Sequence, residues 1–163
     1  MDNFDYVTKE LGNDKIAEIY SLLGPLDYSQ YTEPKEDDSP RYDARAGGSD
    51  DSFEEKRVPV TDFEKRRSGA IYRGNVLTTN NRPDGPGIKI FNGNSLFEGF
   101  FSDGRTHGYG RAITSKGEVY QGGFHEDHMD GYGFYVWPDG RIYEGEWQLG
   151  KKSGNGKYFW PNG

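Results

Sequence analysis

Short runs of alternating apolar and polar residues fill the second half of the chain and recur at a fixed interval. A Tyr-x-Gly triplet that begins at Tyr120 returns at Tyr143, and a Gly-x-Gly pair that begins at Gly131 returns at Gly154. Both intervals are 23 residues, which is the spacing of a structural repeat and not of a catalytic motif. Four units carry the glycine pair, at Gly85/Gly87, Gly108/Gly110, Gly131/Gly133 and Gly154/Gly156.

Each unit contains two short extended pieces, such as residues 143–147 and 156–160, joined by a polar, glycine-rich connection that is typical of a β-hairpin. Units are joined by turns such as Pro138-Asp139-Gly140, where Asp-Gly tolerates the positive φ of a tight turn. We therefore predict an all-β fold, an elongated single-layer antiparallel meander of β-hairpin repeats within residues 68–163. The four repeats are expected at about residues 72–96, 97–119, 120–142 and 143–163.

Alternation along the strands assigns the side chains to two faces. In the second strand of each unit, one face carries an apolar column of Ile90, Ile113, Val136 and Phe159. The opposite face carries Phe91, Thr114, Trp137 and Trp160. The last two units have the densest aromatic surface, formed by Tyr135, Trp137, Tyr158 and Trp160. Most aromatic residues of such an array serve its own packing. The sequence offers no second layer to cover this surface, which makes it a candidate binding site.

A helical pattern is confined to residues 1–24. Its apolar stripe consists of Ile16, Ile19, Tyr20 and Leu23. Gly24 and Pro25 end the pattern. Because a short amphipathic helix is marginal alone in water, we expect it to pack on the chain's own sheet, to fray, or to lie in a groove of a partner.

Charge is distributed unevenly along the chain. Residues 1–68 carry 17 acidic and 10 basic side chains and therefore hold all of the net charge of −7. Residues 25–67 combine many charges with few apolar groups, so we predict a disordered acidic linker. A chain without a basic field is a poor match for nucleic acid, which we exclude as a partner.

Composition also limits the compartments and the chemistry. The absence of cysteine excludes a disulfide framework and a thiolate metal site. The N-terminus has no apolar run typical of a secretory signal, and no stretch approaches the roughly 18 apolar residues of a membrane span. His125, His128 and Asp130 lie in a polar connection that we interpret as an exposed loop, not a metal site. We predict no catalytic residues, no metal, no cofactor and no enzymatic activity.

The Tyr-x-Gly and Gly-x-Gly pattern, clearest in Trp-Pro-Asp-Gly-x-x-Tyr-Glu-Gly from Trp137 to Gly145, closely resembles the MORN repeat (membrane occupation and recognition nexus). The resemblance covers about residues 69–163. It implies an elongated, twisted antiparallel sheet that acts as a scaffold or a protein-binding groove. It also implies a cytoplasmic protein of a ciliary, axonemal or cytoskeletal assembly, because members of the family occur in such structures and at junctions between membranes.

These observations lead to two functional hypotheses from different classes. In the first, Tyr135, Trp137, Tyr158 and Trp160 receive a helix or an added strand of a partner protein, so the chain is a non-catalytic scaffold. In the second, Lys65, Arg66 and Arg67 contact anionic phospholipids, so the chain is a peripheral membrane adaptor. Two further expectations are a homodimer that forms through the C-terminal edge near Phe159, and an N-terminal helix that inhibits partner binding.

Overall fold

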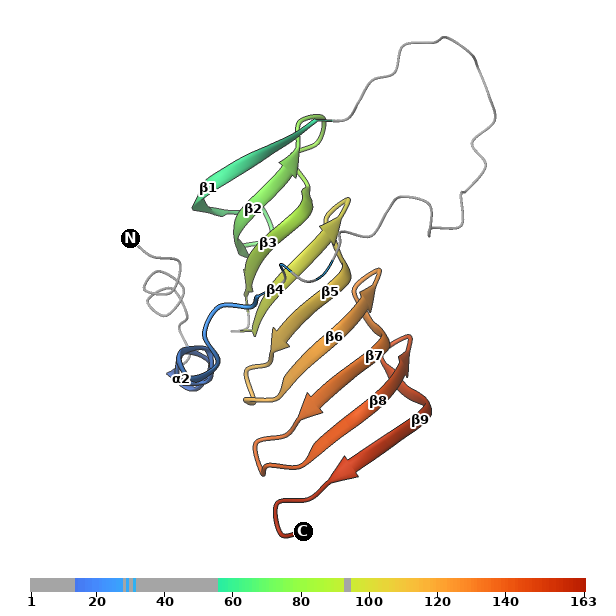
Figure 1. Cartoon of the computed structure of the whole chain (residues 1–163). Helices are drawn as coiled ribbons and strands as arrows, with labels where there is room; N and C mark the ends of the chain where they lie inside the picture. The colour runs from blue at the N-terminus through green and yellow to red at the C-terminus, as the bar shows by residue number, and fades with distance from the viewer. Residues whose placement is uncertain (1–13, 28, 30, 32–55, 93–94) are drawn as a thin grey trace, which may run out of the picture.

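The computed structural model describes residues 14–27, 29, 31, 56–92 and 95–163, and in them the chain forms one antiparallel sheet (Figure 1). Every strand pairs with its neighbour in the sequence, in the order β1 to β9. The strands are β1 (Arg57–Lys65), β2 (Ile71–Leu77), β3 (Pro83–Phe91), β4 (Ser95–Ser102), β5 (Arg105–Ile113), β6 (Val119–His125), β7 (His128–Val136), β8 (Ile142–Gln148) and β9 (Lys151–Phe159). One helix, α2 (Asp14–Leu23), precedes them. The predicted all-β antiparallel meander with a short N-terminal helix is confirmed.

A column of glycines crosses the sheet and fixes its register. It consists of Gly74, Gly87, Gly99, Gly110, Gly122, Gly133, Gly145 and Gly156, each paired with the next. A Cβ atom at Gly133 would lie 2.5 Å from the hydroxyl oxygen of Tyr120, and the ring of Tyr143 blocks the same volume at Gly156. Each ring therefore fills the space of a missing side chain, and the repeat renews this contact in every unit.

The face that carries these rings, here called the aromatic face, holds one of two cores. Its buried residues are Tyr72, Val76, Phe97, Phe101, Tyr120, Phe124, Tyr143 and Trp147. Neighbouring rings meet edge to face, with centroids 4.9 Å apart for Phe97 and Phe124 and 5.3 Å apart for Tyr120 and Trp147. This is the arrangement that the charge distribution of aromatic rings favours, so the sheet forms a core on this face from its own side chains.

The opposite face, here called the helix face, carries α2. Ile16 and Tyr20 of α2 are fully buried against an apolar group of Ile88, Ile90, Leu96 and Ile113. The helix ends at Gly24, which has a φ of 69° and donates its amide to the carbonyl of Tyr20 at 2.9 Å. Of the outcomes expected for this segment, the structure shows packing on the chain's own sheet. The helix thereby adds a partial second layer to the sheet.

Strand β1 corrects one boundary. The sequence predicts a disordered linker over residues 25–67, but residues 57–65 form a strand that pairs with β2. The strand was missed because it lacks the Tyr-x-Gly pattern and most of its side chains are exposed, so neither repeat nor burial marks it in the sequence. Residues 1–13, and residues 28, 30 and 32–55 of the predicted linker, lie outside the described residues.

The packing of α2 leads to a stability prediction. Replacing Ile16 with Ala removes a fully buried side chain and should lower the free energy of unfolding by about 2–5 kcal/mol. The matched control is Leu22→Ala on the same helix, where the side chain is 79% exposed and the expected loss is below about 0.5 kcal/mol. Urea denaturation followed by circular dichroism measures both. Equal losses in the two variants would contradict the docked position of α2.

Candidate protein-binding surface

The four aromatic residues predicted as a binding site lie together on the aromatic face, and we call them the aromatic surface: Tyr135, Trp137, Tyr158 and Trp160. The rings of Tyr135 and Trp137 are 4.7 Å apart, and the ring of Trp137 stacks on that of Tyr158 at 6.2 Å. The ring of Tyr158 lies 6.4 Å from that of Trp160. Strand pairing explains the cluster, because both Tyr135 and Tyr158 lie directly opposite Tyr143.

Burial divides the aromatic surface into a supported half and an exposed half. Tyr135 and Trp137 are half-buried and pack against the core of the aromatic face. Tyr158 and Trp160 are 48% and 55% exposed. A rigid base under exposed rings is the usual composition of a protein-binding hot spot, since aromatic rings offer a large contact area at a low entropic cost.

Two cationic side chains, Lys152 and Arg141, lie over the rings of this surface, and neither contact is evident from the sequence. The Nζ of Lys152 lies 4.5 Å from the ring centre of Trp137 and 4.9 Å from that of Tyr158, whose hydroxyl accepts a hydrogen bond from it at 2.7 Å. The guanidinium of Arg141 lies 5.1 Å from the ring centre of Trp137 and 5.6 Å from that of Trp160. Arg141 is already paired with Asp139, whose carboxylate accepts a hydrogen bond from its Nε at 2.7 Å. The surface therefore presents ring faces for apolar groups together with the ammonium of Lys152 for a carboxylate. Lys152 is opposite Trp147 in the sheet, a pairing that the sequence alone does not reveal.

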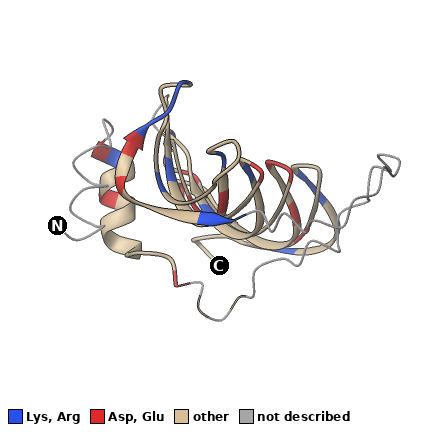
Figure 2. Ribbon diagram, turned by 90° about the horizontal axis from the view of Figure 1, so that it is seen from above, with Lys and Arg blue, Asp and Glu red and all other residues tan. Residues whose placement is uncertain are grey.

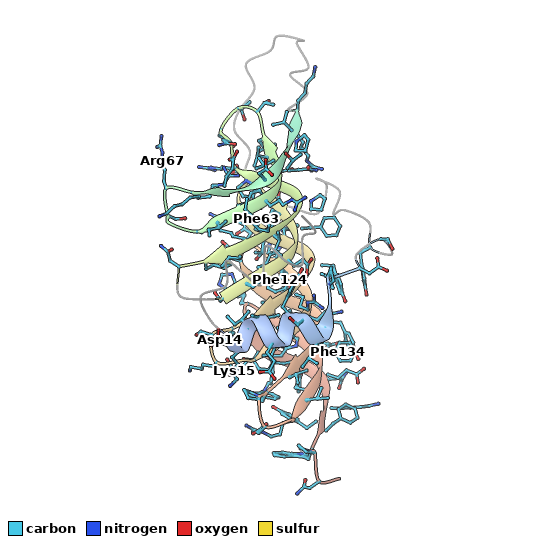
Figure 3. All side chains as sticks on the ribbon, turned by 90° about the vertical axis from the view of Figure 1, so that its left-hand side faces the viewer. Asp14, Lys15, Phe63, Arg67, Phe124 and Phe134 are labelled. Atoms are coloured by element: carbon cyan, nitrogen blue, oxygen red, sulfur yellow. The ribbon has the colours of Figure 1, made fainter. Side chains whose placement is uncertain are left out.

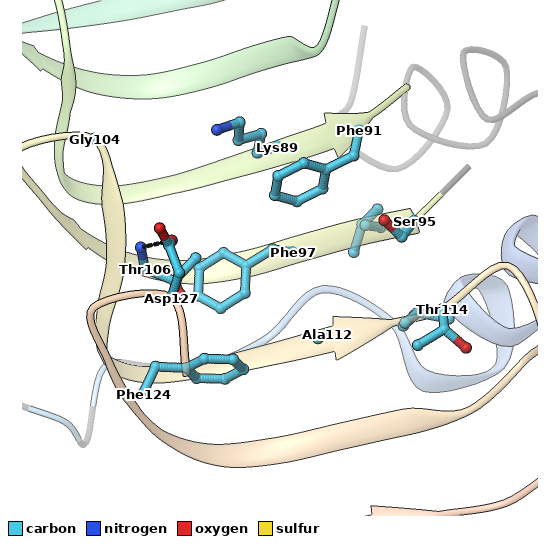
Figure 4. Close-up of a pocket in the computed structure, with 12 residues that line it drawn as sticks. Lys89, Phe91, Ser95, Phe97, Gly104, Thr106, Ala112, Thr114, Phe124 and Asp127 are labelled. Carbon is cyan, nitrogen blue, oxygen red and sulfur yellow. Dashed lines mark hydrogen bonds between the residues drawn. The ribbon is translucent and has the colours of Figure 1, made fainter. Parts of the chain in front are cut away.

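A pocket of about 350 Å³ lies further along the aromatic face, between β3 and the β6–β7 turn (Figure 4). Phe91, Phe97 and Phe124 contribute rings to its wall, and Lys89 contributes an ammonium group. Burial lowers the pKa of Lys89, while the carboxylate of Asp127 acts in the opposite direction. Asp127 is itself held by the amide of Thr106, which donates to it at 2.8 Å. The pocket cannot be predicted from the sequence, because its walls come from three different repeats.

The three basic residues of the lipid hypothesis do not form a continuous patch. Arg66 turns its guanidinium over the ring of Tyr72 at 5.0 Å and donates a hydrogen bond to the carbonyl of Asn81 at 3.2 Å. Lys65 ends β1 and Arg67 lies in the following turn, and both are exposed. Figure 2 shows basic and acidic residues interspersed along the sheet. Only two of the three residues are therefore presented to an anionic surface.

The discounted metal candidates have structural roles. His128 makes a hydrogen bond through Nδ1 with the carbonyl of Glu126 at 2.8 Å, and Asp130 accepts one from the amide of Leu149 at 3.2 Å. Within the described ranges, no group of three acidic, histidine or cysteine side chains is arranged to hold a metal ion. Among the residues that the structure describes, no helix has the length and apolar composition needed to cross a membrane.

An open repeat sheet with an exposed aromatic surface defines a class of interaction modules. Comparison with protein families identifies the MORN repeat at residues 97–119, 120–140 and 143–163. The chain is a MORN-repeat protein, and such repeats are commonly protein-binding or lipid-binding and generally non-catalytic. A comparison with curated proteins finds no match. The first predicted repeat, residues 72–96, lies outside the three matches, but β2 and β3 continue the glycine column there.

The cation contacts predict a local contribution to stability. Lys152→Ala removes an ammonium group that lies over several rings and should lower the free energy of unfolding by about 1 kcal/mol. The control is Lys151→Ala, an exposed neighbour that the alternation of the strand directs to the other face, with an expected loss below about 0.5 kcal/mol. Thermal denaturation distinguishes the two variants. An equal or larger effect at Lys151 would refute the assignment.

The raised pKa of Tyr135 leads to a prediction that the free energy of unfolding falls at high pH. Burial, assisted by the carboxylate of Glu118, raises the pKa of Tyr135 to about 12 from its ordinary value of 10.0. The folded chain holds this proton more tightly than the unfolded chain, so the contribution is complete below pH 10 and declines as pH rises toward about 12. Denaturation between these pH values should show a flatter decline for Tyr135→Phe than for the unmodified chain. Identical slopes would contradict the assignment.

Proposed function

We propose that this protein is a non-catalytic scaffold or adaptor that binds a partner protein through the aromatic surface. The observation that carries the proposal is the run of stacked rings from Trp137 to Trp160, half of it exposed on a rigid sheet. Tryptophan and tyrosine dominate the binding energy of protein interfaces, particularly where neighbouring side chains hold them in place. The common binding role of MORN repeats supports the same conclusion.

The chemistry of the surface limits the partner segment. Ring faces favour apolar side chains, while the ammonium of Lys152 favours a carboxylate, so the partner is expected to present both in one short helix or strand. The N-terminal helix does not support the idea of self-inhibition, because α2 packs on the opposite face of the sheet. A cytoplasmic site in a cilium, axoneme or cytoskeletal assembly remains a proposal that rests on the family alone.

Substitution of the two tryptophans of the aromatic surface, the half-buried Trp137 and the exposed Trp160, tests the proposal. The double variant Trp137→Ala and Trp160→Ala should weaken partner capture by about tenfold or more, because two hot-spot rings are removed. The variant Leu149→Ala, at an exposed apolar loop residue, is the matched control and should leave capture unchanged. Circular dichroism must show the same β signal in all proteins. Undiminished capture by the double variant would end the proposal.

A photo-crosslinking residue at position 160 locates the contact directly. Crosslinks to one partner band should form from position 160, should fail from position 149, and should be lost when Trp137 is also replaced. Crosslinks of equal yield from both positions would show that the contact does not depend on the aromatic surface.

The alternative is a peripheral membrane adaptor, which the exposed side chains of Lys65 and Arg67 support. It predicts sedimentation with anionic vesicles that weakens as salt rises, since exposed charges are screened beyond roughly 10 Å at 0.1 M salt. Binding to neutral vesicles that ignores salt would contradict it. Pairing of a second copy with the edge strand β9 near Phe159 likewise stays a prediction, and the mass of the purified chain in solution tests it.

A further inference from the structure

The site that receives α2 contains a buried ion pair beside its apolar group. Glu98 and Arg111 have side chains only 8% and 4% exposed, and their charged groups lie 3.1 Å apart. Glu98 accepts hydrogen bonds from the hydroxyl of Tyr20 at 3.4 Å and from the amide of Leu26 at 3.0 Å. Arg111 donates to the carbonyl of Gly24. The pair therefore holds the C-terminal end of the helix, while the apolar residues hold its stripe.

Six positions on β3, β4 and β5 define this α2 site. They are Ile88, Ile90, Leu96, Glu98, Arg111 and Ile113. In the sheet, Leu96 lies between Ile90 and Ile113, and Glu98 lies between Ile88 and Arg111. The site thus has two rows of three residues that run across the strands. One row is apolar, and the other contains one apolar residue, one acid and one base.

The same six positions recur 46 residues later on β7, β8 and β9. They are Phe134, Val136, Ile142, Glu144, Lys157 and Phe159, which we call the second helix site. The register is the same, since Ile142 lies between Val136 and Phe159, and Glu144 lies between Phe134 and Lys157. Every apolar position stays apolar, the acid stays an acid and the base stays a base.

The intervening repeat lacks this chemistry. At an offset of 23 residues, Glu98 corresponds to Gln121 and Arg111 corresponds to Phe134, so the ion pair is absent there. The pattern of the α2 site therefore skips one repeat, although the sheet itself repeats every 23 residues. General repeat similarity alone would have copied it into every unit.

The second helix site is open in the described structure. Phe134 and Phe159 are 44% and 47% exposed on the helix face. The hydroxyl of Tyr132 donates to Glu144, and its ring meets that of Phe134 at 5.9 Å, which extends the apolar wall. In Figure 3 the C-terminal strands continue well beyond α2. Four strand spacings of roughly 4.8 Å separate the two sites, about 19 Å in total, while packed helices need only 8–10 Å.

We propose that the second helix site binds an amphipathic helix of a partner protein that presents the chemistry of α2. Such a helix carries an apolar stripe ending in an aromatic residue, followed by a helix end whose carbonyl meets Lys157. The α2 of a second copy is a poorer occupant, because its departure would leave the buried Glu98 and Arg111 without their contacts to Tyr20, Gly24 and Leu26. This inference concerns the opposite face from the aromatic surface and does not depend on it.

A labelled synthetic peptide of residues 14–26 is the direct probe, because this segment occupies the α2 site, whose six positions the second helix site repeats. Titration with the full chain, followed by fluorescence anisotropy, should show saturable binding of one peptide. Phe159→Asp, or Lys157→Glu at an exposed position, should weaken the affinity by about tenfold or more. A peptide carrying Ile16→Asp should not bind. Trp160→Ala, next to Phe159 but on the aromatic face, is the matched control and should leave the affinity within about twofold.

Several outcomes would overturn the proposal. No binding at about millimolar concentration would do so, since a weaker contact is not specific. Peptide binding that ignores both Phe159→Asp and Lys157→Glu would mean exchange with α2 at its own site. Binding that appears only after deletion of residues 1–13 would make the chain's own N-terminal segment the occupant. Concentration-dependent self-association that the peptide inhibits would identify a second copy of the chain as the occupant of the second helix site. Because Trp160→Ala impairs only the aromatic surface, failure here and failure of the proposed function are distinguishable.

Discussion

The contact between a tyrosine or phenylalanine ring and a pair of facing glycines is the constraint on which this fold depends. The ring of Tyr120 lies where a side chain of Gly133 would be, and its hydroxyl donates to the carbonyl of Gly123 at 2.9 Å. Because the ring needs glycine on the strand beside it, a shift of one residue would place a Cβ atom in the ring. Register is therefore determined locally in each hairpin, and an open sheet of this length can form without a continuous second layer.

This constraint leaves the two faces with different tasks. The aromatic face builds a core from rings that contact their neighbours edge to face, from Tyr72 to Trp147. On the helix face, the buried part of the apolar column packs against Ile16 and Tyr20 of α2. A partner that binds the aromatic surface therefore extends a core that already exists, whereas a helix on the opposite face supplies a layer that the sheet cannot make for itself.

The repeat, the strand order and the two faces could all be predicted because each follows from residues close together in the sequence. The aromatic surface could be predicted for the same reason, since alternation alone places Tyr135 and Trp137 on one face. Features that depend on pairing between distant segments could not. Arg111 and Glu98 meet the end of α2 from 72 to 87 residues away, and only this contact gives the two charged side chains their buried role. Strand β1 was missed because its partner, and not its own pattern, makes it a strand.

The two faces also follow different periods, for a physical reason. Every unit must supply its ring and its glycines, because without them the next strand loses its register, so the aromatic face repeats every 23 residues. The helix face has no such requirement, since a helix about 10 Å wide covers about one hairpin and needs matching residues only where it binds. The pair Glu98 and Arg111 recurs 46 residues later as Glu144 and Lys157. The repeat between them has Gln121 and Phe134 at the same two positions. The helix face is therefore free to differ from one repeat to the next, and the acid–base pair that recurs there is a feature that the repeat of the fold does not require.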